Sequence, residues 1–168
     1  DMTRVLRNLS DALRPGGAMY LWMYGKHGRY RHSLNRRLLR MLVDGDDSEA
    51  VEVARRFAVE MGDGAPLADL SGDYTEESWK QLMLGNDAWV ADQFLHPHEQ
   101  VVDIESLAVL AASAGLALDE WLGVPPAFEA APGELRERFA QLNQADQWLA
   151  TDLWLTPESY LVQLARLS

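Results

Sequence analysis

The chain has 168 residues, 48% of them hydrophobic, which suffices for one globular domain with a sizeable core. A net charge of −11 argues against nucleic-acid partners and favours a soluble protein. The absence of cysteine excludes disulfides, thiolate zinc sites and cysteine nucleophiles, and it fits a cytoplasmic protein. No apolar run is long enough to cross a bilayer, so we expect no membrane partner.

A helix and a buried strand are predicted at the start of the chain. Apolar residues at helical spacing predict one apolar face, made of Val5, Leu9 and Leu13 with Leu6 beside them. Pro15 ends this helix, and the glycines at 16–17 let the chain turn back. Residues 18–24 are apolar without alternation. This pattern predicts a strand covered on both faces, as in a parallel sheet flanked by helices.

The middle of the chain is predicted to be mostly helical. Ser33 can cap a first helix, whose apolar side would consist of Leu34, Leu38, Leu39 and Leu42. Asp47 or Ser48 can cap a second helix, whose inward side would consist of Val51, Ala54, Phe57, Ala58 and Met61. Residues 62–75 are rich in glycine and predict a long loop, and a short helix capped by Thr75 follows.

The last third of the chain has clearer signals. Asp103 can cap a helix, and Gly115 stands where a left-handed C-terminal cap belongs. Residues 116–122 predict a strand, and residues 160–167 predict another. Between them, apolar residues at helical spacing predict one helix of about four turns, through Leu135, Phe139, Leu142, Ala145 and Leu149.

The phrase Leu-Arg-Pro-Gly-Gly at residues 13–17, between its helix and strand, resembles one part of the class I methyltransferases that use S-adenosylmethionine (SAM). In that family the phrase lies just before the fifth strand of a Rossmann-like sheet. The resemblance implies an α/β fold, the C-terminal portion of such a sheet. Residues 18–24 would be strand five and residues 116–122 strand six. The terminal segment would be strand seven, antiparallel and between the other two.

The resemblance also implies a domain organisation. Residues 1–168 would be a single, partial methyltransferase-like domain, and residues 33–100 a helical insertion within it. The chain would then begin in the middle of a domain, and the glycine turn and ribose-binding carboxylate would lie upstream of Asp1. The chain itself has no Gly-x-Gly-x-x-Gly. We therefore expect SAM as the cofactor of a longer parent, and little SAM binding or activity from this fragment alone.

Candidate substrate-binding residues follow the first strand, because ligands of open α/β sheets bind beyond the carboxyl ends of the strands. They are Tyr24, Gly25, His27 and Tyr30. Either Tyr24 or His27 can orient a substrate or take a proton. The alternative is a solvated turn with two structural glycines. In the insertion, the two tryptophans that we expect to line a pocket are Trp79 and Trp89.

Two histidines and two carboxylates occur together in residues 92–99. A metal site is one interpretation, but no second cluster completes the ligand set, so we expect no metal. The same stretch is similar to an Asp-x-Phe-x-His-Pro phrase in some SAM-methyltransferase-like proteins. Pro97 restricts the backbone of His96 to extended angles. These observations make His96 the candidate general base that faces the substrate.

Six cationic residues and no acidic residue occur between positions 26 and 40, namely Lys26, Arg29, Arg31, Arg36, Arg37 and Arg40. The cluster can hold an anionic substrate. We favour the other interpretation, a solvated helix face that pairs with acids elsewhere in the fold.

Three possibilities remain open at this point, the third being a protein with the SAM fold that has lost catalysis. The first is SAM-dependent methyl transfer to a small molecule or a protein side chain, which makes the chain part of an enzyme. The second is a non-catalytic helical interaction module, whose basic face docks an acidic partner.

Overall fold

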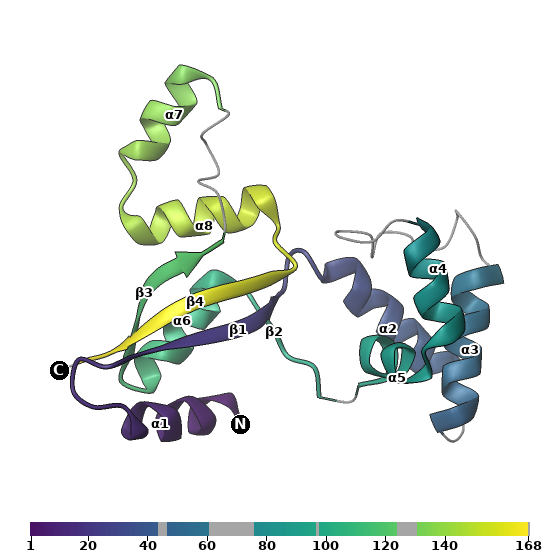
Figure 1. Ribbon diagram of the computed structural model, residues 1–168. Coiled ribbons are helices and arrows are strands. Elements are labelled where there is room, and N and C mark those ends of the chain that lie inside the picture. The colour runs from purple at the N-terminus through teal and green to yellow at the C-terminus, as the bar shows by residue number, and fades with distance from the viewer. Residues whose placement is uncertain (44–46, 61–75, 97, 124–130, 168) are drawn as a thin grey trace. The chain divides into compact units, whose positions relative to one another are not determined.

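The computed structural model describes residues 1–43, 47–60, 76–96, 98–123 and 131–167. They form a mixed α/β structure with one four-stranded sheet (Figure 1). The chain divides into two compact units. The first comprises Asp1–Gly28 and Gln100–Ser168, and the second comprises Arg29–Glu99. Among the described residues, no helix is long and apolar enough to span a membrane.

The sheet of the first unit consists of β1 (Ala18–Gly25), β2 (Val101–Val102), β3 (Leu116–Leu122) and β4 (Ser159–Arg166). Its strand order is β2-β1-β4-β3. Strand β4 is antiparallel to both of its neighbours, whereas β2 runs parallel to the end of β1. The terminal strand therefore lies between β1 and β3, as predicted. The numbering of these strands as five, six and seven of a longer sheet stays a prediction.

Four helices accompany this sheet, namely α1 (Met2–Ala12), α6 (Ile104–Ser113), α7 (Gly133–Ala140) and α8 (Gln144–Leu155). The signals around α6 are confirmed, because Asp103 accepts the backbone N–H of Ser106 and Gly115 has a φ of +74°. The single helix predicted around residues 135–149 is wrong. The chain breaks at Asn143, whose side chain accepts the N–H of Asp146 and starts a second helix, α8.

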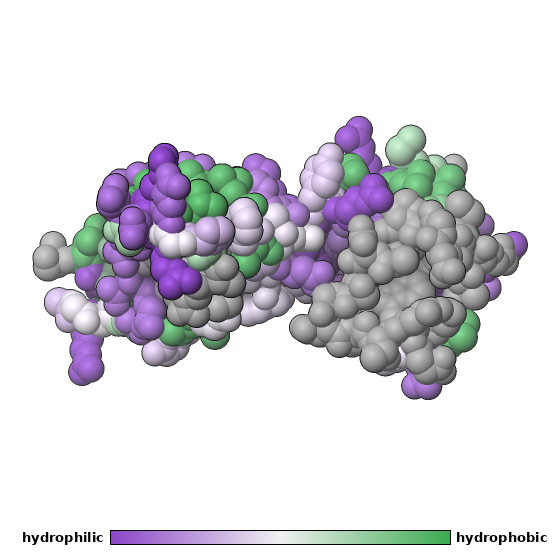
Figure 2. All heavy atoms as spheres, turned by 90° about the horizontal axis from the view of Figure 1, so that it is seen from above, coloured by the Kyte–Doolittle hydropathy of each residue, from purple (hydrophilic) through white to green (hydrophobic). Residues whose placement is uncertain are grey.

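The core of the first unit lies on one face of the sheet. Met23 of β1 and Val162 of β4 pack there with Leu6 of α1 and Leu107 of α6. The opposite face is exposed, and Trp22 has 52% of its surface accessible. The prediction of a strand covered on both faces is therefore wrong, because α1 and α6 contribute to the core on one face alone. Exposed hydrophobic residues occur on both units (Figure 2).

The apolar face predicted for α1 is confirmed in part. Leu6 is fully buried, but Val5 and Leu9 are exposed. The helix turns the side of Leu6 and Ser10 towards α6 and the sheet, and Leu13 lies just past its end. Val5 and Leu9 are thus exposed, whereas Leu13, the third residue of the four-residue repeat, packs against the core.

The second unit consists of α2 (Tyr30–Leu42), α3 (Asp47–Glu60), α4 (Glu76–Gly85), α5 (Asp87–Val90) and a π-helical turn, η3 (Ala91–Leu95). Its buried core is made of Leu39, Val51, Ala54, Met83, Val90 and Phe94. The inward positions predicted for Val51 and Ala54 are confirmed. This unit overlaps the segment 33–100, for which an insertion into a longer domain stays a prediction. The loop predicted over 62–75 lies outside the described residues, and so does Thr75, the predicted cap of the helix that follows.

Helix α2 differs most from the prediction. It begins at Tyr30, so Ser33 is an internal residue of the helix and not its cap. Leu39 is buried, but the other three leucines of the predicted face are exposed, namely Leu34, Leu38 and Leu42. The buried side of α2 is instead mostly polar, with His32, Asn35 and Arg36.

Candidate functional site

The carboxyl end of β1 is built by Tyr24 and Gly25, which pair with β2 and β4 on their two sides. The ring of Tyr24 is half-buried and meets Trp22 edge to face, with 4.5 Å between the centroids. Backbone hydrogen bonds continue past the strand, since the N–H of Lys26 donates to the carbonyl of Val102 at 2.8 Å. This edge of the sheet is where ligands bind in open α/β folds.

The two glycines that flank this turn are required by the packing of the chain against itself. A Cβ added at Gly25 would lie 2.1 Å from the carbonyl oxygen of Pro157, and one at Gly28 would lie 2.4 Å from that of Thr156. The backbone between α8 and β4 therefore occupies the space beside both glycines. This agrees with the interpretation of two structural glycines. It also means that the side of Gly25 and Gly28 on which a Cβ would lie is not open to a ligand.

Lys26 and Asp103 form an ion pair next to this turn, with 2.8 Å between Nζ and Oδ2. Asp103 also caps α6. Burial raises the pKa of Asp103, but the hydrogen bonds from Lys26 and Ser106 outweigh this and hold the pKa well below its usual value. The same hydrogen bond raises the pKa of Lys26. Both groups are thus charged at neutral pH.

The ring of His27 faces Asp152, with 3.8 Å between Nε2 and Oδ2. The Asp152 side chain is fully buried, whereas 32% of the His27 side chain is exposed. Asp152 accepts hydrogen bonds from the hydroxyl of Tyr160 and the backbone N–H of Ile104. Sequence reasoning missed Asp152 and Tyr160. Asp152 and its two donors lie on three different elements, and no local motif signals such an arrangement.

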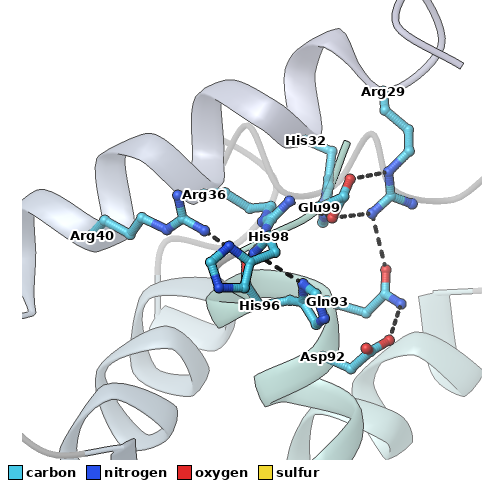
Figure 3. A network of polar contacts seen from close by, with 9 residues as sticks. All are labelled: Arg29, His32, Arg36, Arg40, Asp92, Gln93, His96, His98 and Glu99. Atoms are coloured by element: carbon cyan, nitrogen blue, oxygen red, sulfur yellow. Dashed lines mark hydrogen bonds and ion pairs between the residues drawn. The ribbon is translucent and has the colours of Figure 1, made fainter. Parts of the chain in front are cut away.

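A second polar cluster lies within the helical unit (Figure 3). Glu99 accepts hydrogen bonds from Arg29, at 2.9 Å from Nε, and from Arg36. All three side chains are buried. Burial lowers the pKa of Arg36, and the charge of Glu99 opposes this effect. The cationic segment is therefore not wholly a solvated face, because Arg29 and Arg36 point inward to a shared carboxylate.

His96 is exposed, and its backbone carbonyl accepts hydrogen bonds from Arg36 and from Arg40. Its ring nitrogen Nδ1 accepts the backbone N–H of His98 at 3.2 Å. When the ring is neutral, its proton is therefore on Nε2. The role of His96 as a general base stays a prediction. Within the described parts of the chain, no three acidic or histidine side chains come together as a metal site.

His32 is a further buried histidine that the sequence did not single out. Burial lowers its pKa to about 3, and the positive charges of Arg29 and Arg36 add to the effect. The ring is therefore neutral at physiological pH. Its Nε2 lies 3.9 Å from Glu99, and its ring centroid lies 5.5 Å from that of Phe94. These contacts make His32 part of the packing of the second unit.

The other predicted site residues divide between the two units. Tyr24, Gly25 and His27 come together in the first unit at the end of β1. In the second unit, Tyr30 is exposed at the start of α2. Trp89 packs against Phe94, with 6.2 Å between the ring centroids, beside the core of that unit. The side chain of Trp79 lies outside the described residues.

The fold of this chain is similar to part of a solved protein structure. PKMT2 from Rickettsia typhi matches 98% of this chain with a TM-score of 0.67 and 12% sequence identity. PKMT2 in complex with AdoHcy matches the same share with a TM-score of 0.67 and 13% identity. In both cases this chain covers 32% of the PKMT2 chain. No protein-family model matches the sequence. The chain thus has the fold of about a third of PKMT2, which supports the methyltransferase-like fold that the sequence implies.

Proposed function

We propose that this chain is part of a SAM-dependent methyltransferase that transfers a methyl group to a small molecule or a protein side chain. The observation that carries the proposal is the position of β4, antiparallel between β1 and β3. The resemblance of the Pro-Gly-Gly segment to class I methyltransferases predicts this arrangement. The likeness to PKMT2, which has been solved with AdoHcy, supports it further. AdoHcy is what remains of SAM after its methyl group has been transferred.

Within such a site, we assign this chain to the side of the methyl acceptor. Residues 25–28 leave no space for a nucleotide beside their glycines. The carboxyl end of β1, with Tyr24 and His27, is instead suited to hold and orient an acceptor. SAM supplies the electrophilic methyl group when it is bound. The work left to this chain is alignment of the acceptor and, for an oxygen or nitrogen acceptor, removal of its proton.

The alternative of a module that docks an acidic partner has less support. Lys26 pairs with Asp103, and Arg29 and Arg36 pair with Glu99. Arg40 also donates to the backbone carbonyl of His96. Several members of the cationic cluster thus bind groups of the chain itself.

Calorimetry on the gene product as encoded tests the proposal. We expect it to bind SAM and AdoHcy at concentrations below about 1 mM, the upper end of typical KM values. We also expect it to transfer a radiolabelled methyl group to an acceptor in a panel of amines, alcohols and peptides. Absence of any binding heat with either compound would contradict the proposal.

A further inference from the structure

The pair formed by His27 and Asp152 stands out among the polar groups of the first unit. A fully buried carboxylate lies 3.8 Å from a ring that is partly open to solvent. The imidazole follows β1 directly, at the sheet edge where acceptors are expected to bind. A carboxylate behind an accessible imidazole is the arrangement that orients a histidine for proton transfer.

The position of Asp152 is fixed by two hydrogen bonds. The hydroxyl of Tyr160 donates to Oδ1 at 2.7 Å, and the backbone N–H of Ile104 donates to Oδ2 at 3.1 Å. Burial and the hydrogen bond to Asp152 raise the pKa of Tyr160 well above its usual value. Tyr160 therefore stays protonated and remains a donor, which holds the carboxylate in one orientation.

The charges around His27 favour the same role. Asp152 on α8 is the titratable group in contact with the ring, and Lys26, Asp103 and Tyr160 are the titratable groups around that carboxylate. Lys26 and Asp103 neutralise each other, and Tyr160 is neutral. The carboxylate of Asp152 is then the charge that faces the ring. A positive charge that forms on His27 during proton transfer is stabilised by this carboxylate.

We propose that His27 removes the proton from the methyl acceptor, and that Asp152 is its positioning residue. This inference rests on the proposed methyl transfer and deepens it, since an acceptor with a removable proton is a protonated amine (an ammonium group) or a hydroxyl. The N–H or O–H bond of the acceptor breaks, and its electron pair stays on the nitrogen or oxygen as the nucleophile. The proton forms a new N–H bond at Nδ1 of His27, because Nε2 is the nitrogen nearest Asp152. The exposed part of the ring then releases the proton to water.

This assignment differs from the one that the sequence suggested. His96 has its Nδ1 engaged by a backbone N–H, and among the described residues no carboxylate forms an ion pair with it. His27 has a buried carboxylate behind it. His27 and His96 are thus alternative candidates for the general base.

The pair can be tested without any methyl transfer, by the rate at which diethylpyrocarbonate acylates each histidine. Acylation places positive charge on the ring, so we expect the rate at His27 to fall several-fold in Asp152→Asn and the rate at His98 to stay unchanged. Asp119→Asn, an exposed aspartate bonded to Gln163, is the matched control. An unchanged rate at His27 in a folded Asp152→Asn protein would overturn the pairing.

Methyl transfer then tests the role itself, with a variant that does not disturb a buried group. We expect His27→Gln to lower kcat by about 10²- to 10⁴-fold and to remove the acidic limb of its pH profile, with AdoHcy affinity unchanged. His98→Gln is the matched control and should behave as the wild type. Transfer by His27→Gln within twofold of the wild type, or a comparable loss in His96→Gln alone, overturns the inference. If the wild type binds no AdoHcy, the proposed function fails and the role of His27 as base falls with it. The acylation rates still report whether the pair exists.

Discussion

Replacement of Glu99 by glutamine is expected to loosen the helical unit selectively. The change keeps the size and one acceptor of the side chain but removes its charge. Arg29 and Arg36 then lose the carboxylate that they share, in a site where all three side chains are less than 10% exposed. Removing one partner of a buried ion pair costs about 3–5 kcal/mol. Because the amide of glutamine still accepts one hydrogen bond, we expect the lower end, about 3 kcal/mol.

Hydrogen exchange measured by mass spectrometry resolves this effect by segment. A loss of about 3 kcal/mol raises the exchange rates of protected amides in α2 and η3 by roughly a hundredfold. Amides in β1 and β4 belong to the other unit and should keep their protection. Glu134→Gln is the matched control, since Glu134 pairs with Arg138 across one turn of an exposed helix. Its effect should stay below about 0.5 kcal/mol.

The reasoning would be refuted by a change below about 1 kcal/mol in Glu99→Gln, against the 3–5 kcal/mol typical of buried pairs. It would equally be refuted by equal loss of protection in both units. The first result would mean that solvent reaches the two guanidinium groups. The second would mean that the units unfold together.

Three further predictions concern single positions. Gly25→Ala should destabilise the first unit by about 1–3 kcal/mol or more in urea titrations, because its Cβ meets backbone. Gly133→Ala, where nothing lies within 4 Å, should be neutral or stabilise by about 0.4–1 kcal/mol. His32 is neutral when folded with a pKa of about 3, so the unfolded state binds more protons between pH 6.5 and 3. Stability should therefore fall as the pH drops through this window, by up to about 5 kcal/mol at pH 3, and His32→Gln should reduce this dependence in pH-resolved urea titrations. Thermal melts of Asp103→Ala should show a loss of about 1 kcal/mol from the missing helix cap, whereas Lys26→Met should change stability little. Equal melting temperatures for the two variants would contradict the assignment of Asp103 as the cap.

Elements with local signals could be predicted from the sequence. Helix α6 has its cap at Asp103 and its left-handed glycine at Gly115, both within the segment itself. The position of β4 between β1 and β3 followed from family resemblance. The face of α1 was predicted correctly at Leu6 and Leu13 but wrongly at Val5 and Leu9. The faces of β1 and α2 were predicted wrongly, because a face is defined by what packs on it. The burial of Arg36 depends on Glu99, which is 63 residues away.

The candidate site likewise contains residues with a local sequence signal and residues without one. The Pro-Gly-Gly turn predicts where β1 begins. Because ligands of open α/β sheets bind beyond the carboxyl ends of the strands, Tyr24 and His27 at the end of β1 become candidates. Asp152 had no such signal. It lies on a helix that the apolar repeat misplaced, and its role depends on Tyr160 and Ile104, which come from other elements.

The ion pair between Arg29 and Glu99 joins the first and last residues of the helical unit. A segment whose two ends are tied together presents fixed attachment points, whatever the length of chain between them. Because the entropy of loop closure grows slowly with length, insertions or deletions inside such a segment need not alter the strand that precedes it. The helical unit should thus be exchangeable as a whole. A chimaera that keeps Arg29, Arg36 and Glu99 but replaces the intervening helices should leave β1 and its carboxyl end in place.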